Sequence, residues 1–151
     1  MRAISQRSAP VHVLASGTWL LLAGAAHAAS PIGTWITEGG EAKVRIVHCG
    51  DAICGNIVAL REPRDPATSR PKTDENNRDP RLRSRPLIGV EIAVHMRPNG
   101  RPGQWKGQVY NPEDGGFYPA VLMMLSASRL RLEGCILRDV LCDGQTWIRA
   151  K

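Results

Sequence analysis

The stretch Trp105-Lys-Gly-Gln-Val-Tyr-Asn-Pro-Glu-Asp-Gly-Gly-Phe-Tyr118 predicts two β-strands joined by a tight turn. Side chains alternate along a strand, so Trp105 and Val109 share one face while Tyr110 lies on the other. Pro112 fixes its own φ and removes a backbone donor, and one of the two following glycines can adopt the positive φ that reverses the chain. The expected hairpin carries aromatic residues at its shoulders and two carboxylates at its tip.

Short runs of the same β-rich kind occur on both sides of this hairpin, separated by turns rich in glycine and proline. No stretch of the sequence shows a convincing helical stripe. This pattern predicts an all-β domain, either a closed antiparallel barrel or a sandwich, and closure is favoured because it leaves no unpaired edge. The expected strands are residues 30–37, 42–49, 53–61, 87–97, 105–110, 117–125, 129–137 and 145–150.

Residues 1–28 are typical of a cleaved signal peptide. Two arginines precede an apolar run that ends in the small-x-small site Ala26-His27-Ala28. The run is shorter than the ~20 apolar residues of a spanning helix, so we expect no membrane span after cleavage. Residues 29–151 are then one domain, and loss of Arg2 and Arg7 lowers the formal net charge from +6 to +4. The expected location is the periplasm or the exterior of a bacterium.

Four cysteines remain in this domain, and an even number in a small exported protein indicates disulfides. Three connectivities are possible. We favour Cys49–Cys54 and Cys135–Cys142, because each pair brackets a short turn and directly opposite residues of an antiparallel pair lie within disulfide range. A zinc site is the alternative, but the cysteine spacings are looser than those of structural zinc pairs. We therefore expect no metal.

A long connection, residues 62–86, is rich in proline and arginine and poor in apolar residues. Connections of this length are usually functional or flexible. Its acidic and amide residues could bind a cation such as calcium, but such residues more often form turns capped by their own side chains, so no metal is expected here either. Its arginines suit either an anionic group or pairing with neighbouring aspartates. The residues concerned are Asp74, Asn76, Asn77, Asp79, Arg81, Arg83 and Arg85.

Several motifs together resemble the DUF2147 family of exported bacterial proteins, across nearly the whole domain. They are Gly33-Thr34-Trp35, Val44-Arg45-Ile46, Cys49-Gly50, Cys54-Gly55, Asp74, Asn76-Asn77, Asp79-Pro80, residues 82–87, residues 110–115, Gly134-Cys135 and Gln145-Thr146-Trp147. The chain departs from the family pattern at Arg78, where proline is usual, and at Gly116-Phe117, where a lysine and a small polar residue are common.

The resemblance implies a small eight-stranded up-and-down barrel of the lipocalin or calycin type. Barrels of this type carry Gly-x-Trp on the first strand, here Gly33 and Trp35, and an arginine on the last strand, here Arg149. An arginine over an indole closes the barrel by cation–π contact and hydrogen bonds. We expect these three residues and Trp147 to have this structural role.

The leading functional hypothesis is an exported, non-enzymatic barrel that binds a small apolar or amphipathic ligand. An eight-stranded barrel encloses space for side chains or for one small ligand. If a ligand binds, we expect the entrance near residues 62–86 and the 111–116 turn. The expected rim residues are Asp74, Asn77, Asp79, Arg83, Arg85, Asn111, Glu113 and Asp114. The expected cavity or core residues are Trp105, Val109, Tyr110, Phe117, Tyr118 and Val121, with Val109 and Val121 directed inward.

Two other functions stay open. The chain is alternatively a cell-envelope module whose arginine-rich loop docks a protein or an anionic surface. An enzyme is the third possibility and has the least support, because His48 and His95 are the only histidines of the domain and no catalytic constellation is recognisable. No cofactor is expected. Nucleic-acid binding is a poor fit with the expected export and with the lack of a recognition motif.

Overall fold

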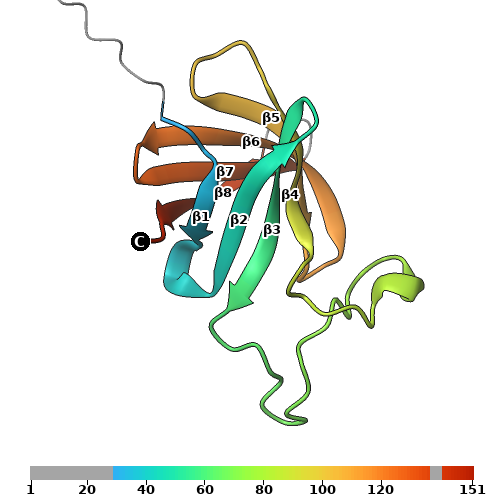
Figure 1. The fold of residues 1–151 in the computed structure, drawn as a ribbon. Helices are drawn as coiled ribbons and strands as arrows, with labels where there is room; N and C mark the ends of the chain where they lie inside the picture. Colours follow the sequence, from blue (N-terminus) through green and yellow to red (C-terminus); the bar gives the residue numbers. More distant parts are fainter. Residues whose placement is uncertain (1–28, 137–140) are drawn as a thin grey trace, which may run out of the picture.

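The computed structural model describes residues 29–136 and 141–151, which form a closed antiparallel barrel in simple up-and-down order (Figure 1). Among these residues no helix is long and apolar enough to cross a membrane. The expected signal peptide lies outside the described residues. The elements are β1 (Gly33–Ile36), η1 (Glu38–Gly40), β2 (Ala42–Cys49), β3 (Ala52–Leu60), η2 (Pro80–Leu82), β4 (Glu91–Pro98), β5 (Gln104–Asn111), β6 (Gly116–Ser126), β7 (Arg129–Ile136) and β8 (Leu141–Arg149).

The barrel prediction is confirmed, and the hairpin quoted first is its most regular part. Strands β5 and β6 pair without a shift in register from Gln104–Met123 to Asn111–Gly116. Inward positions of the strands bury the core, which includes Val44, Ile46, Met96, Leu122, Leu130 and both Trp35 and Trp147. Burial of these apolar side chains is the main favourable contribution to the stability of the barrel.

The two ends of the barrel differ. Because the strands alternate in direction, the β1–β2, β3–β4 and β5–β6 connections all lie at one end, which we call the loop end. The long β3–β4 connection projects there (Figure 1). The β2–β3, β4–β5 and β6–β7 turns lie at the opposite end, together with residues 30–32 that precede β1. We call this second end the closed end.

An arginine stacked on an indole closes the barrel at the closed end. Strands β1 and β8 pair only at Trp35–Arg149 and Ile36–Ile148. The guanidinium carbon of Arg149 lies 4.2 Å from the Trp35 ring centroid, and its NH groups donate to the carbonyls of Ile32 and Ser30 at 2.9 and 2.6 Å. At Gly33, φ is +134° and an added Cβ would lie 2.7 Å from an Arg149 nitrogen, so glycine leaves the space that Arg149 occupies.

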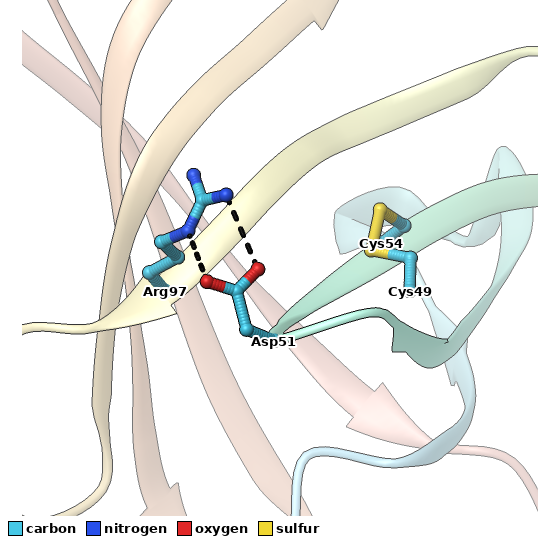
Figure 2. Close-up of a disulfide and its surroundings, with 4 residues drawn as sticks. All are labelled: Cys49, Asp51, Cys54 and Arg97. Atoms are coloured by element: carbon cyan, nitrogen blue, oxygen red, sulfur yellow. Dashed lines mark hydrogen bonds and ion pairs between the residues drawn. A yellow bond between two sulfur atoms is a disulfide. The ribbon is translucent and has the colours of Figure 1, made fainter.

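Both predicted disulfides are present, Cys49–Cys54 and Cys135–Cys142. Cys135 and Cys142 face each other directly, as expected. Cys49 instead faces Ala52 in the register, so its bond to Cys54 runs diagonally across the β2–β3 hairpin. Figure 2 shows this bond next to a bidentate ion pair from Asp51, in the same turn, to Arg97 on β4. That pair is solvent-exposed and contributes little stability by itself.

Replacing Trp35 with alanine is expected to lower the free energy of unfolding by about 3–5 kcal/mol, the usual cost of truncating a large buried aromatic residue. Trp35 is fully buried, and its Nε1 donates to the Pro31 carbonyl at 2.7 Å. Trp105→Ala is the control, since Trp105 is only half-buried and its loss should cost less. Urea unfolding followed by circular dichroism measures both, and equal losses would contradict the closing role of Trp35.

Candidate functional site

A cavity of about 500 Å³ opens at the loop end of the barrel, opposite the Trp35–Arg149 closure. Its walls are mainly inward side chains of the five strands β4 to β8, and its edge is formed mainly by the β5–β6 turn and the start of β8. Such a volume lies within the roughly 300–1,000 Å³ typical of small-molecule sites. The lining residues are Thr37, Ile92, Val109, Tyr110, Asn111, Pro112, Glu113, Asp114, Tyr118, Leu132, Gly134, Cys142, Asp143, Gly144, Gln145 and Trp147.

The deep part of this cavity is apolar, and its edge is polar. Ile92, Leu132 and Trp147 are almost completely buried where they line it. Trp147 donates its indole NH to the side-chain oxygen of Gln145 at 3.1 Å, so the polar atom of the indole is satisfied by a residue nearer the opening. The cavity therefore suits a molecule with an apolar body and a polar end.

At the edge, the turn of the β5–β6 hairpin is held by its own side chains. Asn111 accepts a hydrogen bond from the Glu113 backbone NH, and Asp114 accepts from Gly116 NH at 2.7 Å and from the Tyr118 hydroxyl at 2.6 Å. The Tyr118 hydroxyl holds the pKa of Asp114 below its ordinary value, and the same bond raises the pKa of Tyr118. At neutral pH this pair is therefore a carboxylate and a neutral phenol.

A second polar cluster lies on the outside of the barrel wall. Tyr110 is on the outward face of β5 yet is 1% exposed, because the long β3–β4 connection folds over it. Its hydroxyl donates to Asp74 at 2.6 Å, and Asn77 donates to both Asp74 and the Tyr110 oxygen at 2.8 Å. Arg85 completes the cluster through an ion pair of 2.7 Å with Asp74. We call these four residues the Asp74 network.

The Asp74 network explains how a loop poor in apolar residues is held. Asp74 is fully buried, and each of its carboxylate oxygens has a partner, so the desolvation of its charge is offset. The loop also packs directly on the turn of the hairpin. An added Cβ at Gly115, where φ is +67°, would lie 2.1 Å from the Asn76 carbonyl oxygen. The sequence left open which glycine reverses the hairpin, and the positive φ identifies Gly115.

The predicted rim residues separate into two groups. Asn111, Glu113 and Asp114 line the cavity. Asp74, Asn77, Asp79, Arg83 and Arg85 do not line it. Arg83 donates to the Asn77 carbonyl at 2.8 Å, and Asp79 caps η2 through Arg81 NH and pairs with the Arg81 side chain, which lowers the pKa of Asp79. Arginine pairing with neighbouring aspartates thus occurs within the loop, although the partner of Arg85 is Asp74.

The predicted apolar residues also divide. Val109 and Tyr118, paired across the hairpin, face the cavity, and Trp105 lines a smaller hollow of about 270 Å³ at the closed end. Val121 does not point inward as expected. It pairs with Lys106 and Glu133 on the outward face of the sheet, and Phe117 lies on the same face at 54% exposure. Strand β6 is apolar on both faces, so its pattern alone did not identify the inner one.

The structure adds lining residues that the sequence did not indicate, chiefly from the start of β8. Asp143 and Gln145 share the inward positions of that strand with Trp147, opposite Gly134 and Leu132 of β7. The alternation of Leu130, Leu132 and Gly134 with charged residues indicated the inward face of β7, and so the positions paired with it. The last strand was expected to begin only at residue 145, so Asp143 was assigned to a turn.

Comparisons with known proteins agree with this architecture. A family model described as an uncharacterized protein conserved in bacteria, DUF2147, matches residues 33–149. A solved structure from the human pathogen Helicobacter pylori, described as belonging to the lipocalin family, superposes with a TM-score of 0.65 at 21% sequence identity. The match covers 80% of this chain and 82% of that one, and at this identity it shows the fold alone. No curated protein matches the chain.

Tyr110→Phe is expected to lower the free energy of unfolding by about 1–3 kcal/mol, because it leaves the buried Asp74 carboxylate and Asn77 amide short of a partner. Tyr118→Phe is the matched control. It removes an equally short hydrogen bond at a solvent-exposed carboxylate, where we expect a loss of about 0.5 kcal/mol or less. Urea unfolding of both variants is the measurement, and similar losses would mean that the Asp74 network does not hold the loop.

The pKa of Tyr110 is raised, first by burial and then by its hydrogen bond to Asp74. The neutral phenol is thus favoured in the folded state, and its contribution to stability is complete below the unfolded pKa of about 10 and falls as pH rises through the folded pKa. Tyr118→Phe retains Tyr110 as the sole tyrosine. In this variant, ultraviolet titration should show the phenol ionising at a higher pH in the folded protein than in urea. Coincident curves would contradict the assignment.

Proposed function

We propose that this chain, which belongs to the DUF2147 family of bacterial proteins, is an exported, non-enzymatic barrel that binds one small amphipathic molecule at its loop end. The observation that carries the proposal is the cavity of about 500 Å³, with apolar walls, an opening at one end and a firmly closed opposite end. Two disulfides support export, because such bonds persist in oxidising compartments.

The edge of the cavity indicates the character of the polar end. Glu113, Asp114 and Asp143 lie there, and among the described lining residues there is no lysine, arginine or histidine. Arg78 lies beside Asp114 and offsets part of this charge. We therefore propose a ligand whose polar end is neutral or cationic. A carboxylate would be repelled by these three acidic side chains, and Arg83 and Arg85 do not offset them because they are directed into the loop and not into the cavity.

The same edge supports a non-enzymatic role. A general acid at neutral pH needs a raised carboxyl pKa, whereas the pKa of Asp114 is lowered by its bond from Tyr118. A base at Tyr118 would need a lowered phenol pKa, whereas its pKa is raised. Docking through the arginine-rich loop has less support, because two of its arginines are engaged inside the loop.

Binding is tested by calorimetric titration of the purified protein with dodecylamine, dodecanol and dodecanoate, each below its micellar concentration. We expect the amine or the alcohol to bind, and dodecanoate to bind at least about tenfold more weakly at low salt, with the difference shrinking as salt screens the edge. Equal binding of all three would reject the proposed polar end, and binding of none would reject a site for simple amphiphiles.

Gln145→Phe is expected to block the cavity, because Gln145 lies at its opening on an inward position of β8. Affinity for the best probe should fall at least about tenfold, which corresponds to the roughly 1.4 kcal/mol that separates tenfold affinities. Thr146→Phe is the control, with the same side chain added one residue along the strand on the outward face. Melting temperatures of both variants show whether a loss reflects blockage, and undiminished binding by Gln145→Phe would place the ligand elsewhere.

A further inference from the structure

The outward face of β6 carries an uninterrupted row of apolar residues. Antiparallel strands with one face in water normally alternate apolar and polar residues, and β5 does so with Lys106 and Gln108 outward. On β6 the outward residues are instead apolar, with Phe117 54% and Leu125 47% exposed. The row consists of Phe117, Pro119, Val121, Met123 and Leu125. Exposed apolar surface of this continuity is typical of an interaction site.

The middle of the row lies between opposite charges. Val121 pairs with Lys106 of β5 on one side and with Glu133 of β7 on the other, so the three side chains form one line across the outer wall. Lys106 is exposed, and Glu133 is held by Arg131 through a bond of 2.6 Å to one of its carboxylate oxygens.

We propose that this face binds a second copy of the chain in a symmetric dimer whose twofold axis runs along β6. Rotation about that axis places Val121 against Val121 and exchanges the two sides of the strand. Lys106 of each copy then faces Glu133 of the other, which makes two ion pairs around an apolar centre. A twofold axis in the same plane but across the strand would place Lys106 against Lys106, and charge therefore selects the first arrangement.

The geometry predicts a weak, reversible dimer. Strands of a barrel are tilted by about 35–45° to its axis, so two barrels that meet along β6 cross at a steep angle and contact each other over a limited area. Such an interface falls at the low end of specific protein contacts. We expect a dissociation constant of about 10–100 μM. The ligand cavity lies on the other face of the sheet, so this inference does not depend on the proposed function.

Sedimentation velocity tests the dimer at protein concentrations between about 5 μM and 500 μM, a range that brackets the expected dissociation constant. Lys106→Glu should weaken association at least about tenfold, because symmetry creates two like-charge contacts, and Glu133→Lys should do the same. The double variant, Lys106→Glu with Glu133→Lys, should restore association to within about threefold of the parent, since the opposite charges face each other again. Lys43→Glu, on the outer wall at β2, is the control of equal charge change and should associate like the parent.

Three results would overturn the proposal. These are a parent protein that stays monomeric over the whole range, association that the single charge reversals leave intact, or a double variant no better than either single one. Flotation of the protein with vesicles of neutral phospholipid, abolished by Val121→Gln, would also overturn it by assigning the apolar row to a lipid surface.

Discussion

The stacking of Arg149 on Trp35 is the contact on which the barrel depends, because the seam between the first and last strands is short. Strands β1 and β8 share two residue pairs, whereas β5 and β6 share eight. Arg149 supplements this seam by binding two carbonyls before β1 and the Ala127 carbonyl in the β6–β7 turn. One side chain thus joins the beginning, the end and a turn of the chain, which a ladder of two pairs cannot do alone.

This closure makes the two ends of the barrel different. The chain ends that close the barrel meet at the closed end, and the long connection and the β5–β6 turn lie at the loop end. The long connection was expected to border the entrance, and its composition suited a mobile cover. In the structure the connection packs on the β5–β6 turn at the edge of the cavity, but buried polar contacts hold it in place. The carboxylate of Asp74 and the amide of Asn77 are buried and hydrogen-bonded. Opening the loop would expose these groups or leave them without hydrogen-bond partners. Buried polar groups of this kind resist partial opening, since each lost partner leaves an unmet hydrogen bond.

Local sequence signals predicted the local features correctly and the long-range ones less well. The turn at Pro112, the two disulfides and the position of Trp35 follow from short spacing or from family motifs. The burial of Tyr110 does not, because it depends on Asp74 and Asn77, more than thirty residues away in the chain. The orientation of Val121 failed for a different reason. Alternation identifies the inner face of a strand only when one face is polar, and β6 is apolar on both.

That double apolar character lets one strand serve two separate surfaces. Tyr118, Ala120 and Leu122 point inward, to the cavity or the core, while the alternate residues form the row outside. The β6 backbone lies between the cavity and the outward apolar row. A substitution in the row therefore changes the exterior without adding or removing an atom in the cavity. If ligand binding nevertheless altered self-association, the coupling would have to pass through a shift of the β6 backbone. The uninterrupted pairing of β5 with β6 opposes such a shift, because every pair of that ladder would have to move together. We therefore expect the two surfaces to act independently.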